Sequence, residues 1–370
     1  MPLLFRYLLK ELLIPLLVWW AFLFLLLFVM QFLRATEVLL GPAVTLADIG
    51  RLLLYLGPHF LVMATPVAFL LAILLGMGRL GEDREISAMR GVGLGPWQML
   101  AVPAVLGLLL GVLILVVAST LEPRGLSAVK GLINEIIKKN LVGDVKPGVF
   151  YEDLSNLTLY AERVNPGRGT WSNVLLHDDR DPAAPLLVMA REGRVNPAGQ
   201  GDWLKLALAD GRVHRANRAT ADYAVVAFER AEINVGVEGR IVRKNRFRSA
   251  REEMTPLELL ESAREEKAAG GDPRPMLVTF YSVFGQALTP VAFALVGTPF
   301  AIGGRKGGRA RSLLITVGAY IGYYVLSRVF GNLALQGSLP IPLAVLLPAL
   351  IIGLAGALAM HRYSRVGGSA

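Results

Sequence analysis

The residues most capable of chemistry in this sequence gather in one charged loop between two long apolar segments. Residues 76–93 read GMGRLGEDREISAMRGVG, with Glu82, Asp83 and Glu85 near the start and Arg90 near the end. Acids in the first turn and a base in the last turn suit the dipole of a short helix, and the glycines on both sides are typical helix breaks. We therefore expect a short helix on the membrane surface, either an ordinary solvated connector or a docking site for a partner protein.

The other reactive side chains show no pattern typical of an active site or a metal site. The sequence has no cysteine, and its four histidines, His59, His177, His214 and His361, are widely scattered. The glycine-rich run GGRKGG at 303–308 lacks the Gly-Lys-Ser/Thr ending of a phosphate-binding loop and does not follow a strand. We therefore expect no enzyme, no catalytic residue, no metal and no directly bound cofactor, so that any ATP must be bound by another chain.

Two arginines beside apolar segments are candidates for contact with an anionic group. Arg34 stands just past the first apolar run, and Arg328 lies near one end of the fifth. An arginine in such a place either anchors its helix at the membrane interface or pairs with a phosphate or carboxylate. The residues alone favour the interface anchor for Arg34, whereas the deeper Arg328 favours a partner or a cavity.

The composition requires a bilayer as solvent, because 54% of the 370 residues are hydrophobic and only 18% are charged. A helix needs about 20 apolar residues to cross the hydrocarbon core. Six segments meet this requirement: Leu12–Leu33, a stretch within Leu52–Gly78, one within Pro96–Leu121, one within Met276–Ile302, Ser312 to about Phe330, and about Pro340 to Met360.

The distribution of charge predicts the orientation in the membrane. The segment 122–274 has 24 basic and 23 acidic residues, whereas the rest of the chain has 14 basic and 6 acidic residues. Of the Lys and Arg in the short loops, 11 fall on the side of the N-terminus and 2 on the other side. The positive-inside rule then places both termini in the cytoplasm and the segment 122–274 outside it. Because that segment is nearly neutral, it lacks the basic stripe of a nucleic-acid-binding surface.

The segment between the third and fourth spans predicts a β domain. From Val149 to Val237, short alternating runs are separated by Gly, Pro, Asn and Asp, which is typical of strands. Asp210-Gly211 between two runs suits a two-residue hairpin turn, and about eight short strands indicate a β-sandwich or jelly roll. Thr255 and Glu258 form a capping box that opens a last helix.

The residues therefore predict an α-helical membrane protein with six transmembrane helices and an inserted β-sandwich or jelly roll outside the cytoplasm. With the family resemblance described below, the expected fold class is an α-helical membrane protein with six transmembrane helices and an inserted periplasmic β-jelly-roll domain. The expected parts are transmembrane helices 1–3 at 1–121 with the short helix at about 81–93; a domain at 122–274 with a connecting helix, a jelly roll at about 146–240 and a short helix at about 255–269; and transmembrane helices 4–6 with a cytoplasmic tail at 275–370.

These residues resemble a known family, the lipopolysaccharide export permeases LptF and LptG. The opening RYLLKELLIP and the stretch LGPHFLVMATPVAFLLAILLGMGRLGEDREISAMRGVGLGPW are similar to the family's N-terminus and to its most distinctive segment. VGTPFAIGGRKGG, YYVLSRVFG and an LP before the last span match in outline, so the resemblance covers the full length. The family often opens its last span with Trp-Leu-Pro-Asn, whereas this chain has Leu346-Leu347-Pro348-Ala349, and the motifs do not decide between LptF and LptG.

The resemblance implies a specific assembly in the bacterial inner membrane. Two such permease subunits would join two copies of a cytoplasmic ABC ATPase, which uses the ATP. The pair would extract lipopolysaccharide from the membrane and pass it to a periplasmic bridge of jelly-roll proteins. Two other functions stay open, a permease for another lipid or lipoprotein and a membrane scaffold without transport.

The resemblance also implies which residues contact the ATPase. By position, Glu85 is similar to the acidic residue of the family's coupling helix, which fits a groove on the ATPase, with Ile86, Met89 and Arg90 flanking it in that contact.

The family's lipid site has counterparts as well. Arg34 falls where the family has basic residues that face the phosphorylated headgroup. Spans one and five are the family's lateral gates, which makes Phe28, Phe32 and Arg328 candidates for contact with the lipid.

Overall fold

The architecture is taken from a computed structural model of the chain. The structure describes residues 2–34, 44–144, 147–154, 157–165, 169–179, 185–196, 203–217, 222–236, 250–303 and 308–366. Contacts divide the chain into two units, which are described separately. The helical unit comprises Met1–Met30, Leu53–Ser127 and Ala250–Ala370, and the sheet unit comprises Gln31–Leu52 and Ala128–Ser249.

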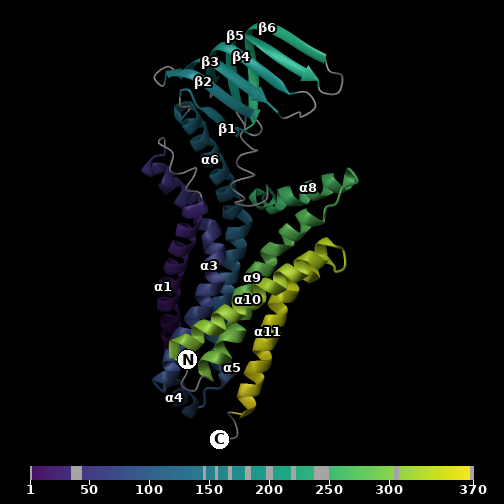
Figure 1. The fold of residues 1–370 in the computed structure, drawn as a ribbon. Helices are drawn as coiled ribbons and strands as arrows, with labels where there is room; N and C mark the ends of the chain where they lie inside the picture. Colours follow the sequence, from purple (N-terminus) through teal and green to yellow (C-terminus); the bar gives the residue numbers. More distant parts are fainter. Residues whose placement is uncertain are drawn as a thin grey trace. The chain divides into compact units, whose positions relative to one another are not determined.

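Six of the described helices are long and apolar enough to cross a membrane, as the sequence predicts. The helices shown in Figure 1 are α1 (Pro2–Arg34), α3 (Leu46–Glu82), α4 (Glu85–Gly91), α5 (Pro96–Val116), a π-helical turn (Val117–Leu121), α6 (Glu122–Asp144), a 3₁₀ turn (Ala250–Glu253), α8 (Pro256–Ala268), α9 (Arg274–Ile302), α10 (Gly308–Leu335) and α11 (Ile341–Val366). The spans belong to α1, α3, the continuous run from α5 into α6, α9, α10 and α11.

The core of the helical unit forms around α3. In the most apolar part of α3, 78% of the residues are buried, against 11% in α1 and 6% in α10. Phe69 and Phe293 are among its largest fully buried side chains. Gly111 in α5 lets that helix approach the backbone of α9, because a β carbon there would overlap the carbonyl oxygen of Ala287. Helices α1 and α10 therefore expose long apolar faces, which suit a bilayer.

The described strands form one six-stranded antiparallel sheet in the order β1-β2-β3-β4-β5-β6 (Figure 1). Their bounds are β1 Phe150–Leu154, β2 Leu157–Asn165, β3 Thr170–Asp178, β4 Leu186–Asn196, β5 Trp203–Asn217 and β6 Asp222–Gly236. In these strands the topology is a meander and does not show the two facing sheets of a jelly roll.

The predicted hairpin turn at Asp210-Gly211 is wrong. Both residues lie inside β5, where Gly211 pairs with Ala190 on one side and Phe228 on the other. Asp210 has a φ of 50°, which is the left-handed conformation that Asp adopts more readily than most residues. Here this conformation produces a local distortion within one long strand and not a turn between two strands. This is one reason why six strands are described where about eight were expected.

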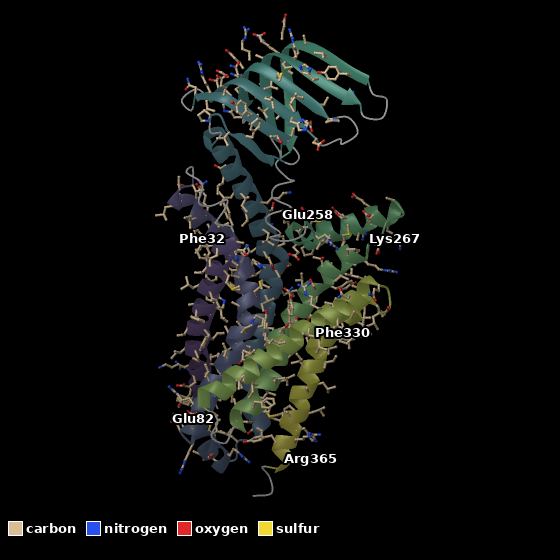
Figure 2. The ribbon with its side chains drawn as sticks, viewed as in Figure 1. Phe32, Glu82, Glu258, Lys267, Phe330 and Arg365 are labelled. Carbon is tan, nitrogen blue, oxygen red and sulfur yellow. The ribbon has the colours of Figure 1, made fainter. Side chains whose placement is uncertain are left out.

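The predicted capping box of α8 is present. The amide N–H and the hydroxyl of Thr255 both donate to Oε2 of Glu258, over 2.7 and 2.9 Å. The backbone bond, followed by the hydroxyl bond, lowers the pKa of the Glu258 carboxyl. The stabilisation is therefore present above the ordinary pKa of glutamate and is lost as the pH falls through the lowered pKa. In Figure 2, Glu258 and Lys267 of α8 lie toward the opposite end of the helical unit from Glu82 and Arg365.

Candidate functional site

The short helix α4 is a packed part of the helical unit. Ile86 is only 4% exposed within the main hydrophobic core, and Met89 packs against that core. Arg84 before the helix has a φ of 61°, and Gly93 after it has a φ of 88°, so left-handed residues change the chain direction at both ends. Its position agrees with the sequence, although the helix itself is seven residues long.

The first turn of α4 is bound to the start of α1. The hydroxyl of Tyr7 donates to Oε2 of Glu85 over 2.7 Å. Close by along α1, Nη2 of Arg79 in α3 lies 2.6 Å from Oε2 of Glu11. A β carbon at Gly76 would lie 2.6 Å from the carbonyl oxygen of Glu11, so α3 can approach α1 this closely only with glycine there. Helices α1, α3 and α4 thus meet around Glu11 and Glu85.

The last turn of α4 is bound to the ends of α9 and α11. Nη1 of Arg90 donates to the hydroxyl oxygen of Tyr363 over 3.3 Å, and its guanidinium carbon lies 5.5 Å from the centre of the tyrosine ring. The same hydroxyl donates to the carbonyl oxygen of Ile302 over 3.0 Å. A single tyrosine of α11 therefore joins the end of α4 to the end of α9.

The side of α4 that faces away from α1, α9 and α11 is exposed to solvent. Glu82, Asp83, Ser87 and Ala88 are exposed, and the side chain of Val92 is 80% exposed. Small side chains on an exposed helix face allow another chain to approach closely, and the two acids beside them favour a basic partner. This surface of Glu82, Asp83, Ser87, Ala88 and Val92 is called the outer face of α4 below.

The structure places the four predicted coupling residues toward the rest of the chain. Glu85 and Arg90 bond to tyrosines of α1 and α11, Ile86 is buried, and Met89 is half-buried. In this conformation the outer face of α4 therefore consists of other residues than the resemblance singled out.

The predicted lipid-contacting residues lie on α1 and α10. Phe28 and Phe32 are half-buried and one helical turn apart, so they share one side of α1. Arg34 is the last residue of α1, and its side chain lies outside the described residues. Arg328 is exposed on α10, where its Nε donates to the hydroxyl of Tyr324, one turn away on the same helix, over 3.1 Å.

Helix α10 also presents a glycine pair that the sequence analysis did not consider. Gly318 and Gly322 form a Gly-x-x-x-Gly motif, and among the described residues no atom lies within 4 Å of a β carbon built at either position. Ile321 between them is 53% exposed. Small residues on a membrane helix allow a second helix to pack closely, so this side of α10 suits a partner span.

A buried hydrogen-bonded contact inside the helical unit was also missed. Nδ1 of His59 in α3 lies 2.8 Å from Oε1 of Glu122, and the two side chains are 9% and 12% exposed. Glu122 opens α6 directly after the π-helical turn, and a β carbon at Gly125 would overlap the carbonyl oxygen of Tyr55. The signal that could have found the pair is a histidine within an apolar span, because an ionisable residue there needs a partner.

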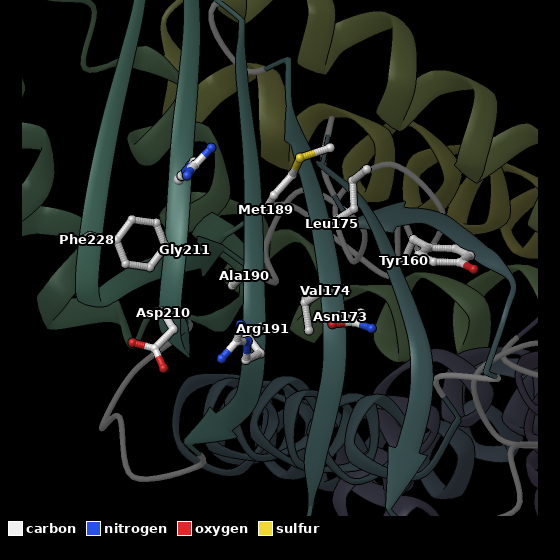
Figure 3. A pocket seen from close by; sticks show the side chains of 11 residues that line it. Tyr160, Asn173, Val174, Leu175, Met189, Ala190, Arg191, Asp210, Gly211 and Phe228 are labelled. Atoms are coloured by element: carbon white, nitrogen blue, oxygen red, sulfur yellow. The ribbon is translucent and has the colours of Figure 1, made fainter.

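The sheet unit has an open pocket of about 790 Å³ on one face of the sheet (Figure 3). Its lining is mixed, with the basic Arg191 and Arg212, the acidic Asp210, and apolar side chains such as Leu175 and Met189. Such a surface can contact both a charged group and an apolar one, but it is not an enclosed apolar channel.

A polar band crosses the sheet within the lining of this pocket. In β3, Ser172 and Asn173 are both exposed between the buried Trp171 and Val174, so the alternation of buried and exposed side chains is interrupted there. The same interruption occurs in β4, where Arg191 and Glu192 are both exposed. Asn173 has a φ of 50°, like Asp210. Figure 3 shows Asn173, Arg191 and Asp210 in line on three neighbouring strands. The buried face of the sheet therefore continues on both sides of a distortion that β3, β4 and β5 share.

We predict that Gly211→Val destabilises the sheet. A β carbon there would overlap the ring of Phe228 and lie 2.5 Å from the carbonyl oxygen of Met189. Because a backbone carbonyl cannot move away as a side chain can, Phe228→Leu should not rescue the variant. The expected cost is about 1–3 kcal/mol, read as faster limited proteolysis of the sheet in the full chain. The control is Ala209→Val in the same strand, and equal proteolysis of the two valine variants would contradict the prediction.

The comparison with known proteins identifies one relationship. The model of a family described as lipopolysaccharide export system permease LptF/LptG matches residues 6–362 of the chain. No curated protein matches the sequence. The matched range includes α4 and its contact with Tyr7, and it ends at residue 362, one residue before Tyr363.

Proposed function

Because this chain belongs to the lipopolysaccharide export system permease LptF/LptG family, we propose that it is a permease subunit of an ATP-driven ABC transporter. In this proposal it extracts lipopolysaccharide from the bacterial inner membrane and passes it to a periplasmic bridge toward the outer membrane. The observation that carries the proposal is the family match over nearly the whole chain, on an architecture with six helices able to span a membrane.

We propose that the end of the helical unit with α4 is cytoplasmic. The start of α1, the end of α3, α4 itself and the end of α11 are rich in Lys and Arg, as cytoplasmic ends are. The basic residues in question are Arg6, Lys10, Arg79, Arg84, Arg90, Arg362 and Arg365. The sheet unit is then periplasmic.

The cytoplasmic partner in this proposal is an ABC ATPase dimer that binds and hydrolyses ATP. Its docking site would be the outer face of α4, where exposed Ala88 and Val92 offer apolar contact and Glu82 and Asp83 favour basic residues of the ATPase. Glu85, Ile86, Met89 and Arg90 would then couple the docked helix to the rest of the permease.

A second permease subunit of the same family would complete the membrane part. The exposed apolar faces of α1 and α10, and the open glycine pair Gly318 and Gly322, support a partner span at these helices. Between the subunits, Phe28, Phe32, Arg34 and Arg328 would contact lipopolysaccharide, with the arginines meeting its anionic headgroup.

The periplasmic partner would be a jelly-roll bridge protein that continues from the sheet unit. Within the described strands, β6 lies at one edge of the sheet and pairs only with β5. It is 15 residues long and exposes Tyr223, Val225 and Val226. A long edge strand of this kind can accept a strand of another protein.

We expect this chain, purified in mild detergent from its native membrane, to carry both a cytoplasmic ATPase and lipopolysaccharide. The measurement is identification of every co-purifying protein and lipid by mass spectrometry. Recovery with the ATPase but another lipid or lipoprotein would replace the substrate in the proposal. Recovery of the chain alone with ordinary phospholipid would overturn it in favour of a scaffold.

A further inference from the structure

Two tyrosines from opposite ends of the sequence hold the two ends of α4. Tyr7 in α1 donates to Glu85 at the first turn, and Tyr363 in α11 accepts from Arg90 at the last turn. Tyr7 is 78 residues from its partner and Tyr363 is 273 residues from its partner. Each contact includes a side-chain hydrogen bond between α4 and a membrane helix.

The two contacts differ from the packing of α4 in what they can transmit. Ile86 and Met89 hold α4 by burial, which is non-directional. The hydrogen bonds of Glu85 and Arg90 are directional and join charged groups to hydroxyls, which makes them stronger than bonds between neutral groups. A displacement of α4 therefore pulls on α1 and α11 through these bonds.

The helix that receives the first bond is suited to move. The start of α1 is fixed by the contact of Glu11 with Arg79, and by the close approach of its backbone to Gly76. Leu12 and Leu16 pack into the core just beyond this point, and after Leu16 the described residues of α1 are exposed or half-buried. A small rotation imposed at Tyr7 can thus move that outer part of α1 without uncovering further buried side chains.

The bond at the other end reaches two helices at once. Because the hydroxyl of Tyr363 also donates to the carbonyl oxygen of Ile302, it joins α11 and the end of α9 to Arg90. A β carbon at Gly303 would lie 3.2 Å from the ring of Tyr363, so the ring fits closely against this helix end.

We propose that Tyr7 and Tyr363 are positioning residues that transmit movement of α4 to α1 and to the α9/α11 pair. This inference rests on the proposed function, since a docked ATPase supplies the movement. It separates two roles on one short helix. The outer face of α4 binds the partner, and the two tyrosine contacts carry its motion into the membrane.

The test uses Tyr7→Phe and Tyr363→Phe, which keep each ring and remove only the hydroxyl. The complex that co-purifies with each variant is reconstituted in vesicles with purified lipopolysaccharide. Three quantities are measured: ATPase recovered per permease, ATP hydrolysed, and lipopolysaccharide released per ATP. Tyr281→Phe in α9 is the matched control.

We expect each variant to keep the bound ATPase and to release about tenfold less lipid per ATP, the factor that one hydrogen bond to a charged group provides. Glu85→Ala should act like Tyr7→Phe, and the two together should be no worse than either, because both remove the same bond. Glu85→Gln keeps an acceptor and should restore part of the coupling.

Unchanged lipid release per ATP in both tyrosine variants would overturn the inference. Loss of bound ATPase in Tyr7→Phe would overturn it too, because the residue would then serve assembly. If the unaltered complex itself neither binds an ATPase nor releases lipid, the proposed function fails, and this inference fails with it.

Discussion

Replacing Ala88 by tryptophan is expected to reduce recovery of the ATPase with this chain strongly while leaving the membrane part folded. Ala88 lies on the outer face of α4 and is exposed, so a larger side chain there meets only solvent within this chain. In the docked state the tryptophan side chain would occupy space that the ATPase fills. A steric clash at a close-packed helix contact costs about 1–3 kcal/mol or more, which is about tenfold or more in affinity.

The measurement is the amount of ATPase per permease after mild-detergent purification. Ala268→Trp provides the matched control, since Ala268 is also an exposed residue of a short helix and lies at the other end of the helical unit. The control should retain the ATPase, and both variants should keep the thermal midpoint of the unaltered chain. Full recovery of the ATPase with Ala88→Trp would rule out the outer face of α4 as its docking site.

The six spans could be predicted from the sequence because transfer into a bilayer depends on the apolar character of a segment by itself. The location of α4 was predictable for a related reason, since its glycines and terminal charges are local signals. The length of α4 was not predictable, because α3 continues to Glu82 and the first residues of the loop therefore belong to α3. Hydropathy and helix capping act within a few residues, and the structure agrees with them.

The inward side of α4 could not be predicted in the same way. Glu85 and Arg90 face inward because Tyr7 and Tyr363 lie next to them in space, and nothing local in the sequence says so. The strand error at Asp210-Gly211 has a comparable origin. Asp-Gly supplies a left-handed residue, and only the neighbouring strands decide whether that residue makes a turn or a distortion inside a strand.

Breaking the contact between His59 and Glu122 is expected to destabilise the helical unit markedly. The carboxylate of Glu122 can only accept, so Nδ1 of His59 donates to it, and both side chains are almost fully shielded. Removal of one partner leaves the other buried without its hydrogen bond, which costs about 1–3 kcal/mol. The variants His59→Leu and Glu122→Leu should therefore each lower the thermal midpoint in detergent by roughly 2–10 °C.

The matched variants separate the bond from the volume of the side chains. Glu122→Gln keeps an oxygen that accepts from His59 and should lower the midpoint much less than Glu122→Leu. The double replacement by leucine should cost clearly less than the sum of the single ones, because no unpaired group is then left buried. Additive losses would mean that the two side chains stabilise the chain independently. In that case the close approach of α3 and α6 at Gly125 would rest on packing alone, without a contribution from the pair.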